Sequence, residues 1–197
     1  MELYSPERTP SNLIDDEAIW HSFKNGDKQA YATLYQRYFN VLFQYSLRIT
    51  GDRELVKDCI HDLFITIWKN RENLSQPDSV RAYLLSAVQR KLRRQTTRLR
   101  SHQNDIEAIS APQLSSCREE QIIEDQTLLQ QKHVVNRALN ALTKRERQAV
   151  YLKFYSNLSY KEVADVMSIG VDSIYNLISK SIETLHGELN KVPATKL

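Results

Sequence analysis

The amino-acid sequence predicts an all-α protein built from two helical domains that a flexible linker joins. Only four glycines and five prolines occur among 197 residues, and apolar residues recur at intervals of three and four instead of alternating. Charge divides the chain: residues 81–100 hold seven basic and no acidic side chains, whereas residues 101–126 hold six acidic side chains and one basic. This reversal indicates a nucleic-acid-facing element followed by a linker.

The first domain is predicted over residues 16–100, after a polar N-terminal tail over residues 1–15. Its expected helices cover residues 17–24, 28–49, 53–70 and 80–98, because turn residues interrupt the apolar pattern between them. The second helix carries its apolar stripe at Tyr31, Leu34, Tyr35, Tyr38, Leu42, Tyr45 and Ile49. The third helix buries Leu55, Cys59, Ile60, Leu63, Phe64, Ile67 and Trp68. Residues 73–79, NLSQPDS, form a loop by their turn chemistry.

The linker is predicted over residues 101–118, the second domain over 119–191 and a C-terminal tail over 192–197. The first helix of the second domain is expected over residues 119–142. Thr143 and Ser159 then each begin a Thr/Ser-x-x-Glu run that is typical of a capping box. EVADVMSIGVDSIYNLISK, residues 162–180, reads as a helix-turn-helix in which Gly170 permits the sharp entry into the second helix. Ser168 stands where the common motif prefers Gly. The alternative interpretation is an ordinary helical hairpin.

The second helix of this motif is weakly charged for a DNA reader. Between Val171 and Leu185 its only basic residue is Lys180, against Asp172 and Glu183. Base edges are read by hydrogen bonds and apolar contacts, while phosphates are met by basic side chains elsewhere. The predicted duplex-DNA contacts are therefore the outward-facing Ser173, Tyr175, Asn176, Ser179 and Lys180, with Arg145 and Lys161 on the phosphates.

Several function classes are not indicated. The two cysteines, Cys59 and Cys117, lie far apart without partners at metal-ligand spacing, so neither a disulfide framework nor a metal site is expected. A phosphate-binding glycine loop and a nucleophile with its base are both lacking, so we expect no enzyme, no catalytic residues, no cofactor and no small-molecule substrate. The N-terminus lacks a signal-peptide core, and no apolar run approaches a bilayer span, so a cytoplasmic protein is expected.

Three segments, in this order, resemble parts of bacterial RNA polymerase sigma factors of the sigma-70 family. ELVKDCIHDLFITIWKNRENL, residues 54–74, resembles the polymerase-binding helix of region two: Asp58, Asp62, Phe64 and Trp68 match, and His61 stands where Gln is usual. SVRAYLLSAVQRKLRRQ, residues 79–95, resembles the promoter-melting helix, and residues 138–185 resemble region four. With two domains and a short linker, the chain is similar to the compact extracytoplasmic-function (ECF) class.

The resemblance implies a non-catalytic, dissociable subunit of core RNA polymerase. Region two would dock on the clamp helices of the largest polymerase subunit, open the minus-ten element and hold the unpaired strand, and region four would read the minus-thirty-five element as duplex. An acidic and apolar stripe at spacings of three and four suits a basic partner helix pair, which gives a predicted polymerase contact at Asp58, His61, Asp62, Ile65 and Lys69. The predicted minus-ten contacts are the polar side chains of the loop and the nearby basic side chains that would bind phosphates. They are Asn73, Ser75, Gln76, Asp78, Arg81, Arg90, Lys91, Arg93 and Arg94.

The resemblance also implies a membrane-associated anti-sigma partner that covers the polymerase-binding and DNA-binding faces. Two departures from the family pattern, Arg90 where Asn is frequent and Tyr175 with Leu177 where Lys or Arg is frequent, bear on the promoter sequence more than on the function. The sequence leaves two other functions open. One is a stand-alone helix-turn-helix regulator, and the other is a sigma-like interaction module without promoter recognition.

Overall fold

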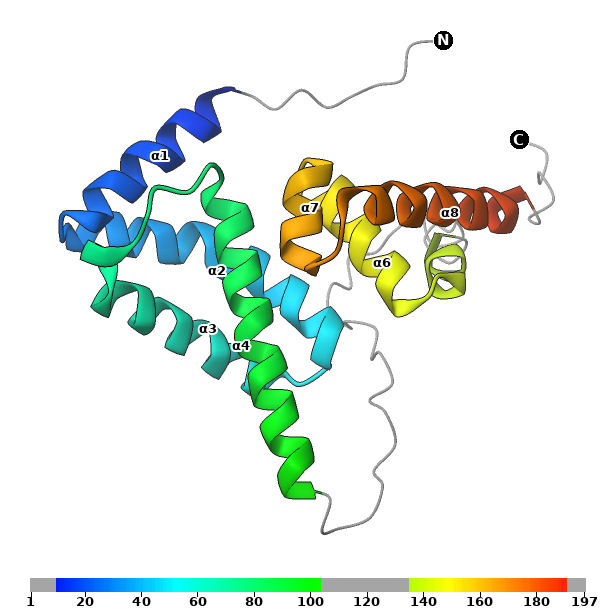
Figure 1. The fold of residues 1–197 in the computed structure, drawn as a ribbon, viewed down its shortest axis with the longest axis horizontal. Helices are drawn as coiled ribbons and strands as arrows, with labels where there is room; N and C mark the ends of the chain where they lie inside the picture. Colours follow the sequence, from blue (N-terminus) through cyan, green and yellow to red (C-terminus); the bar gives the residue numbers. More distant parts are fainter. Residues whose placement is uncertain (1–9, 104–134, 191–197) are drawn as a thin grey trace, which may run out of the picture. The chain divides into compact units, whose positions relative to one another are not determined.

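The computed structural model describes residues 10–103 and 135–190, and these residues form helices and turns without a strand. The chain divides into two compact units at Leu114 and Ser115, each of which is described by itself (Figure 1). The predicted all-α class is confirmed. The division falls within the predicted linker, most of which lies outside the described residues, so the domain limits stay a prediction.

The first unit is a bundle of four helices: α1 (Pro10–Lys24), α2 (Lys28–Thr50), α3 (Arg53–Lys69) and α4 (Val80–Gln103). A short 3-10 helix, η1 (Arg71–Asn73), follows α3. The central helix α2 packs against the other three, and α3 also packs against α4 (Figure 1). Large side chains from all four helices are fully buried between them, among them Trp20, Tyr38, Phe64 and Leu84.

Short polar residues set the helix starts in this unit. The Asp27 carboxylate accepts a hydrogen bond from Gln29 N at 2.7 Å, and Asp52 accepts from Glu54 N and Leu55 N. Gly51 ends α2 in the left-handed conformation at φ 72°, which glycine adopts without a steric penalty. Of the turn residues that were predicted to separate these helices, NGD covers residues 25–27 and TGD covers residues 50–52, and in each an aspartate directly after a glycine starts the next helix.

Two helices run beyond their predicted ends. α1 begins at Pro10 instead of residue 17, inside the segment predicted as a tail, because proline is tolerated in the first turn, where its missing N–H has no helical partner. α4 continues to Gln103, three residues into the predicted linker. Some side chains of the predicted apolar stripes are also less buried than expected. Ile49, in the last turn of α2, is 42% exposed, and the half-buried ones are Tyr31, Tyr35, Leu55 and Trp68.

The second unit contains helical residues 135–141, then α6 (Lys144–Val150), the π-helix η2 (Tyr151–Tyr155), α7 (Tyr160–Met167) and α8 (Val171–Asn190). The rest of the predicted helix over residues 119–142 lies outside the described residues. Both capping boxes are confirmed: Thr143 and Ser159 each accept a hydrogen bond from the backbone of a glutamate whose side chain accepts one in return. The π-helix was not predicted.

The helix-turn-helix is present, but its turn is made differently from the prediction. Ser168 takes the left-handed conformation, at φ 56° and ψ 46°, whereas Gly170 has no positive φ. A Cβ added to Gly170 would lie 3.8 Å from Ser173 Oγ, which is an ordinary contact. The prediction that Gly170 permits the turn is therefore wrong. The left-handed residue is Ser168, which explains why glycine is common there.

Candidate functional site

The predicted polymerase contact is a continuous exposed stripe on α3. The five residues of this α3 stripe are all exposed: Asp58, His61, Asp62, Ile65 and Lys69. Ile65 leaves 49% of its surface in solvent although the opposite face of α3 is buried, so an apolar side chain stands among charged ones. Such a mixture suits a partner that carries both apolar and basic groups.

Aromatic side chains of α2 and α3 support this stripe from beneath. The His61 ring stacks on Tyr35 with centroids 5.8 Å apart, and the Tyr35 hydroxyl lies 3.3 Å from His61 Nδ1. Tyr35 in turn packs edge-on against the buried Phe64 at 4.9 Å. Phe64 therefore supports the surface and does not belong to it, as its position in the apolar pattern predicts. The same contacts place the His61 ring against Tyr35.

The predicted strand-binding loop is exposed, and the indole of Trp20 holds its middle against the bundle. Its polar side chains lie in solvent: Asn73, Ser75, Gln76 and Asp78. The indole Nε1 of the buried Trp20 donates a hydrogen bond to the Ser75 carbonyl at 3.3 Å. Tyr83 packs edge-on against the same indole at 5.2 Å and is half-buried, so it is part of the loop's anchor as well as a partly available ring. Burial raises the pKa of Tyr83, partly offset by the positive charge of Arg90.

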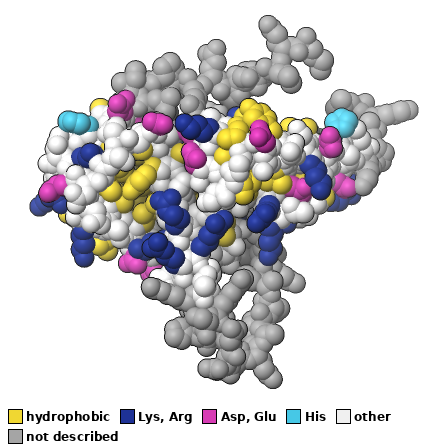
Figure 2. All heavy atoms as spheres, in the orientation of Figure 1, with side chains coloured by type: hydrophobic (Ala, Val, Ile, Leu, Met, Phe, Trp, Pro, Cys, Tyr) yellow, Lys and Arg dark blue, Asp and Glu magenta, His cyan; other side chains and the backbone are white. Residues whose placement is uncertain are grey.

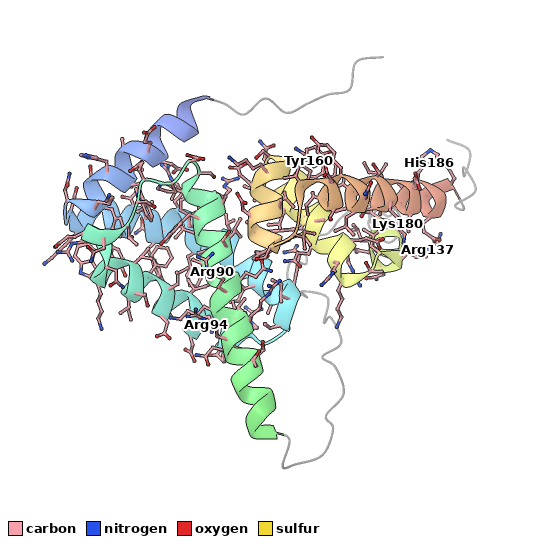
Figure 3. All side chains as sticks on the ribbon, in the orientation of Figure 1. Arg90, Arg94, Arg137, Tyr160, Lys180 and His186 are labelled. Carbon is pink, nitrogen blue, oxygen red and sulfur yellow. The ribbon has the colours of Figure 1, made fainter. Side chains whose placement is uncertain are left out.

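Arg90, Lys91, Arg93 and Arg94 lie on the side of α4 that packing leaves uncovered and form what we call the basic face. Arg81 lies nine residues before Arg90, about two and a half helical turns, and so belongs to another side of α4. Arg90, Arg93 and Arg94 are exposed, while Arg81 and Lys91 are half-exposed. Figure 2 shows Lys and Arg side chains gathered over α4, and Figure 3 labels Arg90 and Arg94 one turn apart on this helix. Between them, α4 buries Val88, Gln89 and Leu92 against the bundle, so the basic residues occupy the side that packing leaves free. A positive face of this kind suits the phosphates of a nucleic-acid strand.

The α3 stripe and the basic face meet at one ion pair. Lys91 Nζ lies 3.4 Å from Asp62 Oδ2, with 25% and 56% of the respective side chains exposed. The packing of α3 against α4 brings these two residues together, although each was predicted for a different partner. The two predicted surfaces therefore adjoin at this ion pair.

In the second unit, the predicted base-reading residues all lie exposed on α8: Ser173, Tyr175, Asn176, Ser179 and Lys180. The inner face of α8 is held by the buried Ile174 and Ile178 against α6 and α7. Arg145 and Lys161 are exposed at the starts of α6 and α7. The structure therefore leaves every predicted duplex contact accessible to a ligand.

Two features of this unit were not predicted from the sequence. The Tyr160 ring stacks on Tyr175, with centroids 4.0 Å apart and an interplanar angle of 18°. The Glu146 carboxylate accepts a hydrogen bond from Thr143 N at 2.8 Å, which with the nearby Lys180 charge holds the pKa of this buried carboxyl below its usual range. The capping box predicted the second contact in part. No sequence signal relates Tyr160 to a residue fifteen positions later.

Other kinds of site find little support within the described residues. No group of three His, Cys, Asp or Glu side chains in residues 10–103 and 135–190 is placed to hold a metal ion. Cys59 is buried, and burial raises the pKa of its thiol, which disfavours the reactive thiolate form. None of the helices that the structure describes is long and apolar enough to cross a membrane.

The sequence matches two family models in the order expected for the two units. The model for sigma-70 region 2 matches residues 34–103, and the model for sigma-70 region 4 matches residues 132–185. Together they cover more than half of the chain. The first match contains most of α2, α3, the loop and α4, and the second contains the helix-turn-helix.

Curated relatives match over nearly the whole length. The chain is 22% identical over 186 residues to the ECF RNA polymerase sigma factor SigK of Mycobacterium sp. (strain JLS), covering 93% of this chain and 95% of the relative. It is 23% identical over 190 residues to the SigK of Mycobacterium bovis (strain BCG / Pasteur 1173P2), covering 94% and 97%.

Two solved structures share the fold. CnrH, in complex with the cytosolic domain of CnrY, matches with a TM-score of 0.59 and 18% identity, covering 89% of this chain and 97% of CnrH. The sigma factor RpoE of Bartonella quintana, in complex with the anti-sigma factor NepR, matches with a TM-score of 0.63 and 16% identity, covering 83% and 98%.

Proposed function

The chain belongs to the sigma-70 family of RNA polymerase sigma factors, in the ECF class, and we propose that it initiates transcription through three separate surfaces. The α3 stripe binds core RNA polymerase. The loop over residues 73–79 and the basic face of α4 bind the melted minus-ten element, and the exposed face of α8 reads the minus-thirty-five element. Sigma factors are not enzymes, and this chain acts by binding alone.

The observation that carries the polymerase assignment is the exposure of Ile65 among charged residues on a helix whose other face is buried. An apolar side chain half in solvent, flanked by Asp58 and Asp62, offers both contact area and charge to a basic helix pair. His61 adds an aromatic surface that Tyr35 holds in place. Because core polymerase and the chromosome lie in the bacterial cytoplasm, we propose that the protein acts there.

The test is initiation by the full chain with core polymerase. Wild-type protein should comigrate with core polymerase and start transcription at a defined promoter. Asp58→Arg with Asp62→Arg should abolish comigration, since both substitutions place positive charge against a basic partner. The matched control is Glu17→Arg with Glu72→Arg, which makes the same charge change at exposed positions outside the stripe and should leave comigration intact.

Each outcome has a direct reading. Equal loss in both double variants would mean that net charge, not the stripe, determines binding, and unchanged binding in the stripe variant would refute the assignment. Failure of the wild-type chain to bind core polymerase or to start transcription on any genomic fragment would refute the function itself.

We further propose that an anti-sigma partner covers these same surfaces when the protein is idle. RpoE was solved in complex with the anti-sigma factor NepR, CnrH was solved in complex with the cytosolic domain of CnrY, and this chain shares the fold of both. A partner of this kind should compete with core polymerase for the α3 stripe. Copurification of the chain with a protein that core polymerase displaces would support the proposal, and simultaneous binding of both would contradict it.

A further inference from the structure

Tyr175 is the one aromatic side chain among the base-reading residues of α8, and it is already in contact before any ligand binds. Its ring lies parallel to that of Tyr160, with centroids 4.0 Å apart, yet half of its surface remains exposed. Tyr160 is the first residue of α7 and Tyr175 is the fifth residue of α8. The stack therefore ties the start of α7, where Figure 3 labels Tyr160, to the exposed face of α8.

Tyr160 is itself held on several sides. The capping box fixes the backbone directly before it, because Glu162 Oε2 accepts a hydrogen bond from Ser159 N at 2.6 Å and Ser159 Oγ accepts one from Glu162 N at 3.3 Å. Lys153 Nζ lies 4.5 Å from the centroid of the Tyr160 ring and donates a hydrogen bond to the Leu158 carbonyl at 3.2 Å. A cation held over an aromatic ring is attracted to it, so Tyr160 forms a rigid support.

A tyrosine on an exposed helix face normally samples several rotamers, and ordering it on binding costs free energy. Stacking on Tyr160 removes most of that freedom in advance. It also covers one face of the Tyr175 ring, while half of the residue's surface stays exposed. On the base edges of the major groove, the C5-methyl of thymine is the apolar group that an exposed aromatic ring can contact.

We propose that Tyr160 is a positioning residue that fixes the Tyr175 ring as a reader of a thymine methyl in the duplex promoter element. The inference rests on the proposed function, in which α8 enters the major groove. It assigns specificity to an apolar contact, which agrees with a helix whose only basic residue between Val171 and Leu185 is Lys180. Ser173 and Asn176, beside Tyr175, supply the hydrogen bonds.

The experiment replaces each thymine of the minus-thirty-five element by deoxyuridine, one at a time, and measures initiation by holoenzyme made from the full chain. The ratio of initiation on the thymine and uracil templates reports the value of each methyl. For wild-type protein, uracil at one position should reduce initiation by about two- to tenfold, which corresponds to the strength of a good aromatic contact. Tyr175→Ala should bring this ratio close to one.

Variants at Tyr160 test the positioning role. Tyr160→Phe retains the stacked ring and should retain the full methyl dependence, whereas Tyr160→Ala and Tyr160→Leu should lose most of it. Because the ratio is taken within each variant, a general loss of folded protein cancels. The double variant Tyr160→Ala with Tyr175→Ala should lose no more of the methyl dependence than Tyr175→Ala alone, since both changes remove the same contact.

Three results would overturn the inference. Wild-type protein that is insensitive to uracil at every position does not read a methyl. Full methyl dependence in Tyr160→Ala and Tyr160→Leu, with loss in Tyr175→Ala, means that Tyr175 needs no support. Absence of any initiation by the wild-type holoenzyme overturns the proposed function and this inference with it, and it is distinguished because the unmodified promoter is then also inactive.

Discussion

The turn of the helix-turn-helix offers a test in which the sequence pattern and the structure predict opposite results. Ser168 is held at φ 56°, where a residue with a Cβ is strained by about 1–2 kcal/mol. Glycine removes that strain, but its greater conformational freedom stabilises the unfolded chain by about 0.4–1 kcal/mol. Ser168→Gly should therefore stabilise the second unit by about 0.5–1 kcal/mol.

Gly170 should respond differently. A Cβ at this position meets Ser173 Oγ at 3.8 Å and requires no movement. Gly170 precedes α8, and its carbonyl accepts a hydrogen bond from Ile174 N at 3.2 Å, so it occupies the N-cap position. Alanine there gains about 0.4–1 kcal/mol through the unfolded state and loses a similar amount as a poor cap. Gly170→Ala should change stability by less than about 0.5 kcal/mol.

The two units can be followed separately, because both tryptophans, Trp20 and Trp68, lie in the first one. Urea unfolding of the full chain should show unchanged tryptophan fluorescence transitions in both variants. The circular dichroism transition of the second unit should move to higher urea in Ser168→Gly and stay in place in Gly170→Ala. A stability loss of more than about 2 kcal/mol in Gly170→Ala, or any loss in Ser168→Gly, would refute the assignment of the left-handed residue.

Three further predictions concern the pKa of Glu146, the loop over residues 73–79 and the basic face of α4. Because the folded-state pKa of Glu146 is lowered, its stabilisation is present above the ordinary carboxyl pKa of 4.5 and lost as the pH falls through the lowered value; in Glu146→Gln, unfolding of the second unit should lack this acid-dependent loss. Trp20→Phe should destabilise the first unit by about 1–2 kcal/mol, read by Trp68 fluorescence, and speed hydrogen exchange in the loop that Ser75 anchors. Replacing Arg90, Arg93 and Arg94 by alanine should reduce the salt slope of single-strand binding by about 0.7 for each phosphate that is no longer bound; an unchanged slope would remove these residues from the interface.

The sequence was sufficient to place α2, α3 and the two helices of the helix-turn-helix and to predict the exposed sides of α3 and α8, because both follow from short-range periodicity. The capping boxes at Thr143 and Ser159 were read from residue type, whereas Asp27 and Asp52 were predicted only as parts of breaks and prove to be N-caps. The extension of α1 to Pro10 and the π-helix at Tyr151–Tyr155 were not readable, since each depends on a small difference between two allowed backbone paths.

The contacts between elements were largely beyond prediction. The stack of Tyr160 on Tyr175 and the ion pair of Lys91 with Asp62 each join two helices, and the pattern within one helix does not say which residue of its neighbour lies opposite. The turn at Ser168 was missed for a different reason. A glycine two residues later offered a familiar explanation, and a single sequence does not show which of the two residues has the positive φ.

The ion pair of Lys91 with Asp62 leads to a final prediction, in which one substitution raises the affinity for single-stranded DNA and lowers the affinity for core polymerase. In the free protein, Asp62 neutralises Lys91 across 3.4 Å, so the basic face has less charge available than its sequence suggests. Asp62→Asn should release Lys91 and raise the affinity of the free chain for a single-stranded oligonucleotide by about two- to fivefold, the range of a partly exposed ion pair. The same substitution should weaken binding to core polymerase.

Asp58→Asn is the matched control, since Asp58 shares the α3 stripe but takes part in none of the ion pairs found among the described residues. It should weaken polymerase binding without raising oligonucleotide affinity. Fluorescence anisotropy at several salt concentrations separates the two effects, because a released lysine also steepens the salt dependence. Equal gains in both variants would show that net charge alone is responsible. A gain confined to Asp62→Asn would show that the ion pair with Asp62 limits the charge that Lys91 offers to a single strand.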